Sequence, residues 1–330
     1  MESLSWGRVP RTQETTRLAP SPTGALHLGN ARTFLVNWAL ARRRGWRVVL
    51  RIEDLDGPRV KPGAAESCID TLRWLGIDWD EGPLVQSHDL APYTLAMETL
   101  ASRGAAYACE LTRSEIEQAA SAPQATIAGD APGETRFPAS LRPAPPAPTR
   151  FADTGTNWRF ATPETSVEFV DAFAGPQRLR PCDTIGDFVV WTRRGQPAYQ
   201  LAVVVDDHRQ GITQVVRGND LLDSAARQIL LSRALGTSPE PCYIHLPLVV
   251  GPDGRRLAKR HGDTRLETYR ALGVAPARVV GLAAYWCGML AGREELAPRA
   301  FADALDMDSI PRENVACTEE DDRWLRAGAR

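Results

Sequence analysis

Hydrophobic segments in the first 60 residues alternate with short loops. A short apolar strand begins near Thr16, a helix pattern covers residues 31–44, and the segment WRVVLRIED that follows predicts a second strand. Strand, helix and strand joined by short loops form a βαβ unit and therefore a parallel sheet. The first loop then lies at the end of a strand and the start of a helix, where open α/β sheets bind nucleotides.

The pattern further along the chain predicts more elements and one interruption. Helical spacing predicts helices over residues 63–79 and 89–104, and a change to Ala, Pro, Gly and Ser over 119–148 indicates an irregular insertion. Strand signals resume at 158–160, 167–169 and 188–193, where we expect the second half of the nucleotide fold to restart. The apolar run YQLAVVVDD after them is typical of a strand buried in a parallel sheet. The remaining predictions are a helix over 220–235, a strand with a turn over 245–254, and helices over 264–272 and 276–291.

The composition is that of a folded globular protein. The chain has 330 residues, 43% hydrophobic and 24% charged, enough for about two domains. No apolar stretch approaches the roughly 18 residues of a membrane span, and the N-terminus lacks the features of a secretory signal. We therefore expect a cytoplasmic protein with a disordered tail over residues 1–16. The net charge of -2 excludes a protein that is basic all over, so a nucleic-acid partner would have to meet a local patch.

The loop RLAPSPTGALHLGN has the features of a phosphate site. Pro20 and Pro22 stiffen it, Gly24 and Gly29 let the backbone approach a ligand closely, and His27 can donate to a phosphate oxygen. The helix that follows directs its N–H groups at the same anion. Taken alone, this segment would be better explained as a proline-rich turn whose histidine packs or caps the helix.

A second segment, GPDGRRLAKRHG, is strongly basic. Only Lys61 and Lys259 are lysines, whereas 37 of the 39 basic residues are arginine, so a compact ammonium group is indicated at Lys259. A positive, glycine-bounded loop suits the stabilisation of a leaving pyrophosphate. Taken alone, it would be better explained as a solvated basic loop.

Together the two segments resemble the paired signatures of class I aminoacyl-tRNA synthetases, with HLGN at 27–30 and RLAKR at 256–260. RLAPSPTGALHLGNART, RIEDLD and AYQLAVVVDDHRQGITQVVRGNDLL are similar to the glutamyl group, and the likeness covers about residues 17–290. It implies an α/β fold: a class I synthetase-type, Rossmann-like parallel sheet as nucleotide-binding domain, an inserted α+β subdomain and a C-terminal helical region. The expected boundaries are 17–107 and 181–245 for the two halves of the catalytic domain, 108–180 for an insertion like an acceptor-binding domain, and 246–330 for the signature loop and helical region.

The resemblance also implies site residues. Glutamate carries two carboxylates and one ammonium, so its pocket needs two guanidinium groups, a carboxylate and hydroxyl donors. The positions that match the family's pocket are Arg17, Ser21, Glu53, Tyr199 and Arg217. Which arginine binds which carboxylate stays open. Without the family, Glu53 would be interpreted as an ion-pair partner of Arg51, and Tyr199 as a core residue with a satisfied hydroxyl.

For the nucleotide, the resemblance implies binding of ATP, with Mg²⁺ accompanying it. The residues it assigns to ATP are Pro20, His27, Gly29, Asn30 and Lys259, of which His27 and Lys259 are the expected catalytic residues. The second signature has Ala258 where serine is usual, which removes a hydroxyl and keeps Lys259.

The insertion departs from the family. Members commonly hold zinc through two cysteines one residue apart and a later tyrosine and cysteine. Here Cys109 is the one thiol retained, and the other positions hold Leu111, Phe137 and Leu141. One thiolate cannot build a tetrahedral site, so we predict no structural zinc.

Only 70 residues follow Arg260, so we expect the large helical anticodon-binding region of glutamyl-tRNA synthetases to be absent. In this respect the chain resembles truncated paralogues, the glutamyl-Q tRNA(Asp) synthetases. That resemblance implies tRNA-independent, ATP-dependent activation of L-glutamate and its transfer to the queuosine base in the anticodon of tRNA(Asp), by a monomer with no membrane partner. Two alternatives stay open: a truncated glutamyl-tRNA synthetase that charges an acceptor end, and a catalytically silent paralogue that binds glutamate or RNA.

Overall fold

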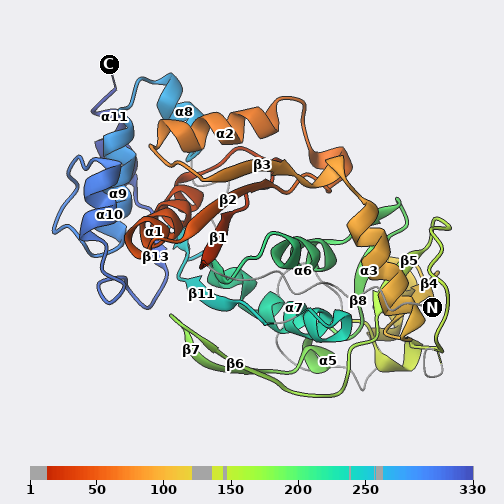
Figure 1. Ribbon diagram of the computed structural model, residues 1–330. Coiled ribbons are helices and arrows are strands. Elements are labelled where there is room, and N and C mark those ends of the chain that lie inside the picture. Colours follow the sequence, from red (N-terminus) through yellow and green to blue (C-terminus); the bar gives the residue numbers. More distant parts are fainter. Residues whose placement is uncertain are drawn as a thin grey trace.

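The computed structural model describes residues 13–120, 136–143, 147–237, 239–255, 257 and 263–329. At its centre is a five-stranded parallel sheet with the strand order β11-β10-β1-β2-β3 (Figure 1). The strands are β1 (Thr15–Leu18), β2 (Arg47–Ile52), β3 (Glu81–Val85), β10 (Gln214–Gly218) and β11 (Cys242–Leu246). The chain runs from β1 first to one side and later to the other, as in the predicted Rossmann-like domain, so the topological switch point lies between β1 and β10.

Helix α1 (Leu28–Arg44) connects β1 to β2 and covers one face of the sheet. A capping box fixes its start: Nδ1 of His27 accepts from the N–H of Asn30 at 3.3 Å, and the Asn30 side chain accepts from the N–H of His27 at 3.0 Å. Gly45, in the left-handed region, ends the helix.

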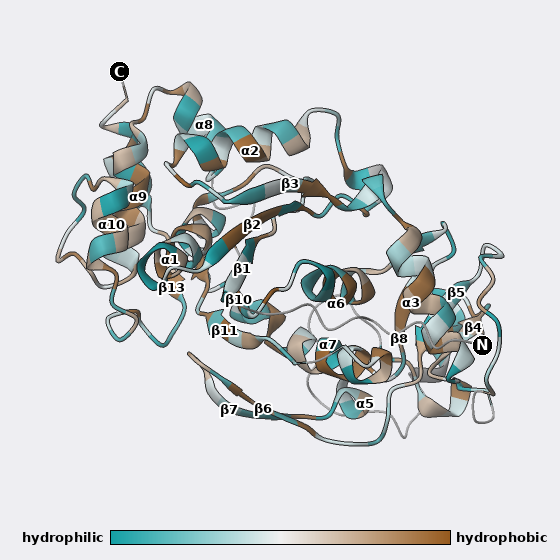
Figure 2. Ribbon diagram, in the orientation of Figure 1, coloured by the Kyte–Doolittle hydropathy of each residue, from teal (hydrophilic) through white to brown (hydrophobic). Residues whose placement is uncertain are grey.

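Side chains alternate between the two faces of the sheet and pack in two hydrophobic cores. On β2, Val48 and Leu50 pack in the core shared with α1, whereas Val49 packs in the core on the opposite face. The hydrophobic residues of β2 are the brown segment of that strand in Figure 2. The helices of the opposite face are α3 (Ala91–Ser102), α6 (Tyr199–Arg209) and α7 (Leu222–Leu235).

The insertion forms a separate antiparallel sheet with the order β4-β5-β8-β9. Its strands are β4 (Ala106–Cys109), β5 (Asn157–Phe160), β8 (Phe188–Thr192) and β9 (Gln196–Pro197). The strands near 158–160 and 188–193 therefore belong to the insertion, and the prediction that they restart the parallel sheet is wrong; that sheet resumes at β10. A hairpin of β6 (Val167–Asp171) and β7 (Gly175–Leu179) contacts β11.

The strand predicted for YQLAVVVDD is also wrong, because these residues form α6. Three consecutive valines favour a strand by propensity. Here, however, the helix is buried on several sides, since Leu201 and Val205 are fully buried in the core that α6 shares with α3 and α7. A helix buried all round carries the same continuous apolar run as a buried strand.

The segment after Gly292, which has little periodicity, nevertheless folds. It contains α10 (Pro298–Ala304), β13 (Val315–Ala316) and α11 (Glu319–Arg326). Strand β13 pairs with β12 (Val249–Val250), and α10 packs on α1 together with α9 (Pro276–Trp286). This is the predicted C-terminal helical region.

The remaining elements are short helices. They are α2 (Ala64–Trp74), α4 (Arg113–Ala120), α5 (Pro181–Thr184), α8 (Leu266–Ala271) and the 3-10 helices Gly57–Arg59, Gln86–His88, Ala139–Leu141 and Asn219–Leu221. At the N-terminus, β1 begins at Thr15, so residues 15 and 16 belong to the sheet and not to the predicted tail, of which residues 1–12 lie outside the described residues. No helix in the described ranges is long and apolar enough to cross a bilayer.

Candidate active site

A cavity of about 520 Å³ lies at the carboxyl ends of β1 and β10, which is the switch point of the sheet. Its volume is within the range of small-molecule sites. Nine of the ten predicted site residues line it: Arg17, Pro20, Ser21, His27, Gly29, Asn30, Glu53, Tyr199 and Arg217. The tenth, Lys259, lies outside the described residues. The structure thus brings the predicted set together, and the individual roles stay predictions.

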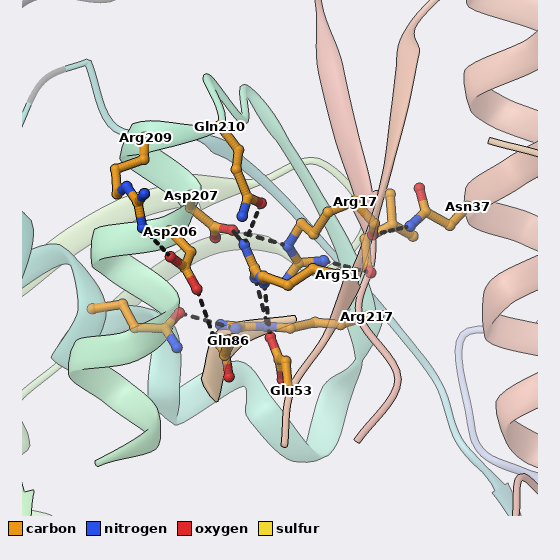
Figure 3. Close-up of polar contacts among 12 residues, drawn as sticks. Arg17, Asn37, Arg51, Glu53, Gln86, Asp206, Asp207, Arg209, Gln210 and Arg217 are labelled. Carbon is orange, nitrogen blue, oxygen red and sulfur yellow. Dashed lines mark hydrogen bonds and ion pairs between the residues drawn. The ribbon is translucent and has the colours of Figure 1, made fainter. Parts of the chain in front are cut away.

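Three buried arginines lie on the same face of the sheet and extend toward Asp206 and Asp207 (Figure 3). Arg17, Arg51 and Arg217 come from β1, β2 and β10. Adjacent buried cations need an anion, and Asp207 of α6 supplies it. Its Oδ1 lies 2.7 Å from Nη1 of Arg51 and 3.4 Å from Nε of Arg17. Burial lowers the pKa of Arg17, and Asp207 opposes that effect.

Arg51 makes its hydrogen bonds within the protein. It donates to Oε1 of Glu53 from Nε and Nη2, at 3.3 and 3.1 Å, and to Asp207 and Gln210 from Nη1. Although burial disfavours its charge, Asp207 and Glu53 raise the pKa of Arg51. The ion pair considered for Glu53 is therefore present, and Glu53 also lines the cavity. Arg51 holds this carboxylate where it can accept a ligand's ammonium group.

Arg17 and Arg217 keep donors for a ligand. Within the described ranges, Arg17 donates one hydrogen bond, from Nη1 to the carbonyl of Val216 at 3.4 Å, and its buried Nε faces Asp207, so Nη2 is the group left for a ligand. Arg217 donates from Nε to His245 at 2.9 Å, from Nη1 to Gln228 at 2.9 Å and from Nη2 to the carbonyl of Leu221 at 3.2 Å. These bonds use three of its five N–H groups. Two such guanidinium groups at one cavity suit a ligand with two carboxylates.

Two hydroxyl groups complete this part of the cavity. Tyr199 begins α6 and is 41% exposed, and in the described part of the chain its hydroxyl has no hydrogen bond. Its interpretation as a core residue with a satisfied hydroxyl is therefore wrong. Ser21 is exposed and contacts the hydroxyl of Thr23 at 3.4 Å. Both hydroxyls belong to cavity residues and fit a polar ligand.

His27 both caps α1 and lines the cavity. Because Nδ1 accepts the N–H of Asn30, the neutral ring carries its proton on Nε2, which is then the donor of the ring. A Cβ at position 29 would lie 3.1 Å from both Cε1 and Nδ1 of His27, so Gly29 leaves space for the ring. The capping interpretation is correct, and it fixes the tautomer that can donate to a phosphate.

The segment with the second signature lies largely outside the described residues, but both of its flanks are described. On one side, Leu248 and Val249 line the cavity. On the other, Leu28 donates its N–H to the carbonyl of Thr264 at 3.0 Å, and Leu266 donates to the carbonyl of Leu26 at 2.8 Å. The flank after the segment is thus held at the turn that carries His27, and the flank before it lines the same cavity as that turn.

A second cavity, of about 630 Å³, adjoins the first. The two cavities share Tyr199, Asp220 and Leu221. The insertion and α7 supply three arginines to its walls: Arg113, Arg159 and Arg227. The same walls also carry the carboxyl groups of Asp187 and Asp220. A ligand in the first cavity can meet a second ligand at Tyr199.

The four positions at which zinc ligands would stand form an apolar cluster. Cys109 and Phe137 are buried in it, and Leu111 and Leu141 pack against them. One thiol among apolar side chains does not fit a zinc ion. In the part of the chain that the structure describes, no group of three or more His, Cys, Asp or Glu could hold a metal.

Asp207 and His245 are site residues that the sequence reasoning missed. The sequence predicts a strand for the segment that contains Asp207, and a strand there does not indicate a contact between Asp207 and Arg51. His245 belongs to no motif, but it stands in register with Arg217 on the adjacent strand, and strand alternation predicts that the two share a face.

Comparisons with known proteins identify the family. Residues 13–308 match the family model described as tRNA synthetases class I (E and Q), catalytic domain. The glutamyl-Q tRNA(Asp) synthetase of Symbiobacterium thermophilum is 46% identical over 94% of this chain and 98% of that protein, and that of Rhodopirellula baltica is 45% identical over 90% and 92%. A glutamate–tRNA ligase of a Synechococcus species is 38% identical over 94% of this chain and 65% of its own length.

Solved structures agree with the sequence relatives. The glutamate-tRNA synthetase of Elizabethkingia anophelis superimposes with a TM-score of 0.78 and 26% identity, over 95% of this chain and 70% of that chain. A glutamate tRNA ligase of Elizabethkingia meningosepticum, in complex with its amino acid, gives 0.77 and 27%, over 95% and 68%. The predicted class I synthetase fold is confirmed. The chain therefore belongs to the class I tRNA synthetases of the glutamate and glutamine group, and it is a ligase that activates glutamate.

Proposed function

We propose that this enzyme forms glutamyl-adenylate from L-glutamate and ATP without tRNA, and then transfers the glutamate to the queuosine base of tRNA(Asp). The relatives named glutamyl-Q tRNA(Asp) synthetase support the acceptor. They align over 98% and 92% of their own lengths, whereas the Synechococcus glutamate–tRNA ligase aligns over 65%.

In the first step, Arg17 and Arg217 bind the two carboxylates of glutamate, and Glu53 accepts its ammonium group. The hydroxyls of Ser21 and Tyr199 add polar contacts. An α-carboxylate oxygen attacks the α-phosphorus of ATP, the bond to the β-phosphate oxygen breaks, and pyrophosphate leaves. Positioning by the two arginines lowers the entropic part of this barrier.

Residues of the HLGN turn bind the nucleotide. His27 donates from Nε2 to a phosphate oxygen, and Pro20, Gly29 and Asn30 shape the turn beneath it. Lys259 neutralises charge on the leaving pyrophosphate. Mg²⁺, bound with the nucleotide, would neutralise further phosphate charge.

The observation that carries the second step is the junction of the two cavities at Tyr199. A nucleoside in the second cavity lies beside the activated acyl group. A queuosine hydroxyl oxygen attacks the acyl carbon, AMP leaves, and the hydroxyl proton passes to solvent. Arg113, Arg159 and Arg227 match the phosphates of a single-stranded anticodon loop, whose bases can be splayed out and read.

Two assays test the proposal. Glutamate-dependent exchange of pyrophosphate into ATP is expected without tRNA, and its absence would favour a silent paralogue. Labelled glutamate is expected on tRNA(Asp) that carries queuosine and not on the same tRNA with guanosine. After ribonuclease digestion the label should remain with the anticodon fragment and not with the 3′-terminal adenosine, since the terminal ribose is not the acceptor. Label on the 3′-terminal adenosine of tRNA(Glu) would instead identify a truncated glutamyl-tRNA synthetase.

We further propose a monomer that works in the cytoplasm with its tRNA. Sedimentation of the purified protein tests it.

A further inference from the structure

A buried histidine on the neighbouring strand holds Arg217 in place. His245 on β11 stands in register with Arg217 on β10, and Nε2 of His245 accepts a hydrogen bond from Nε of Arg217 at 2.9 Å. Both side chains are buried, with 1% and 5% exposed. The direction of this guanidinium group therefore depends on an acceptor at Nε2.

Behind His245 lies Asp171, at the end of β6 in the hairpin that the insertion contributes. Its Oδ2 lies 2.6 Å from Nδ1 of His245, and its carboxylate also accepts the backbone N–H of His245 at 3.2 Å. The N–H groups of Phe173 and Ala174 donate to Oδ1 at 2.9 and 2.7 Å. Burial raises the pKa of Asp171, but the hydrogen bonds from His245 and Ala174 lower it by more. The side chain of Asp171 is therefore ionised and is held in place by these hydrogen bonds.

This chain of contacts works in one protonation state of the ring. A carboxylate at Nδ1 requires the proton on Nδ1, which leaves on Nε2 the lone pair that Arg217 needs. A doubly protonated ring would direct an N–H at the N–H of Arg217 and set two positive charges side by side. His245 must therefore be neutral while Arg217 keeps the observed position.

We propose that Asp171 and His245 are positioning residues for the amino acid, holding Arg217 so that its remaining N–H groups face a substrate carboxylate. The inference rests on the proposed role of Arg217 in glutamate binding. It makes the β6–β7 hairpin of the insertion part of the amino-acid site, and it makes glutamate affinity sensitive to acid.

The groups that face His245 come from four elements. Asp171 lies on β6 and Arg217 on β10, while Tyr243, on β11 itself, stacks on the ring with centroids 5.8 Å apart. The carbonyl of Leu221, just before α7, is also a neighbour. Burial lowers the pKa of His245 below its ordinary value, with Asp171 opposing and Arg217 assisting. The ring is then neutral at physiological pH and takes up its proton below about pH 6.5.

The test measures kcat and KM for glutamate and for ATP in pyrophosphate exchange, between about pH 5 and pH 8.5, so that the glutamate side chain stays ionised. The proteins are the wild type, Asp171→Asn, His245→Gln and the control Asp321→Asn. Asp321 is 1% exposed, as is Asp171, but it caps α11 and pairs with Arg293 away from the cavity. Circular dichroism and melting temperature report on folding.

For Asp171→Asn at high pH, we expect KM for glutamate to rise about tenfold or more, and KM for ATP and kcat to change less than about threefold, since uniform binding is lost. The wild-type kcat/KM for glutamate should fall about tenfold per pH unit in acid, as one proton is taken up. The amide oxygen of glutamine accepts a hydrogen bond and does not titrate. The kcat/KM for glutamate of His245→Gln should therefore stay within about tenfold of the wild-type value at high pH, and it should not fall in acid. Loss of the acid fall assigns that fall to His245 and not to His27 or to Glu53, whose pKa is raised by burial. Asp321→Asn should leave KM unchanged.

A normal KM for glutamate in folded Asp171→Asn would overturn the inference. So would an acid fall of kcat/KM for glutamate that persists unchanged in His245→Gln. The two variants test the inference separately, so it remains falsifiable if one of them does not fold. A wild type without glutamate-dependent exchange would overturn the proposed function itself, and the inference with it.

Discussion

Nη1 of Arg51 donates to Oδ1 of Asp207 over 2.7 Å, and this buried ion pair joins the sheet to α6. Helix α6 begins with Tyr199, so the pair sets the distance between the strands and one wall of the cavity. We predict that Asp207→Asn lowers the free energy of unfolding by about 3 kcal/mol or more, because it leaves buried arginines without their anion. It should also raise KM for glutamate. Urea denaturation and pyrophosphate exchange measure the two effects.

The same chemical change at an exposed ion pair is the control. Asp303 pairs with Arg299 at 3.2 Å on the surface of α10. Asp303→Asn should change the free energy of unfolding by less than about 1 kcal/mol. Equal decreases in the free energy of unfolding of the two variants would show that the buried ion pair stabilises the protein no more than the exposed one.

Tyr199→Phe separates a functional hydroxyl from a structural one. The hydroxyl of Tyr199 bonds to nothing in the described part of the chain, so its removal should leave the melting temperature unchanged and raise KM for glutamate about tenfold, the value of one lost hydrogen bond to a charged group. Tyr93→Phe is the matched control, because Tyr93 donates to buried Asp206 at 2.8 Å. It should cost about 1–3 kcal/mol of stability and leave KM unchanged. A lower melting temperature with an unchanged KM for glutamate in Tyr199→Phe would show that the Tyr199 hydroxyl does not bind the substrate.

Gly29→Ala tests the packing of the histidine ring. Its Cβ would lie 3.1 Å from two ring atoms of His27, a contact that requires the ring to shift by a few tenths of an ångström. We expect adenylate formation to fall about tenfold or more, since a misplaced catalytic group loses its alignment. Gly292→Ala, whose Cβ meets nothing within 4 Å, should be as active as the wild type.

Lys259→Ala should reduce adenylate formation about 100-fold or more and leave glutamate binding nearly intact, because a charge directed at the leaving pyrophosphate acts mainly in the transition state. Lys259→Arg tests whether the ammonium group itself is needed. Exchange rates and glutamate binding by calorimetry give the answer. Full activity of Lys259→Ala would exclude the role.

The purified protein should contain no stoichiometric zinc, and a chelator should change neither its melting temperature nor its activity. The reason is the largely apolar cluster around Cys109, which offers one thiol, while the hydroxyl of Tyr107 donates to Asp187 at 2.6 Å. Elemental analysis that finds one zinc per chain would mean that the site lies elsewhere.

The sequence predicted the parts of the site that depend on local order. Arg17 is the last residue but one of β1 and Glu53 directly follows β2, at the carboxyl ends that the predicted βαβ unit places together, whereas their selection as site residues came from the family resemblance. His27 could be placed at the start of α1 because the turn before it contains proline and glycine.

The parts that depend on distant contacts could not be predicted. The hydropathy of α6 does not distinguish a helix buried all round from a buried strand, so Asp207 was misplaced. Asp171 lies 74 residues before His245 in the sequence, and the two meet through the docking of a hairpin that no local pattern encodes. Both errors concern how α6 and the β6–β7 hairpin pack against the sheet, which depends on contacts between residues distant in the sequence.

One hydrophobic core runs without interruption from the parallel sheet into the insertion. It includes Val49 and Val215 of the sheet, Leu201 of α6, and Phe160 and Trp191 of the insertion. Residues that share a core tend to unfold together, so the insertion and the catalytic sheet form one cooperative unit and not two bodies joined by a hinge. Tyr199 begins the helix that lies within this unit, so the junction of the two cavities is built in before either substrate arrives. The proposed RNA nucleoside would then enter a preorganised cleft, and binding it would cost the enzyme little reorganisation.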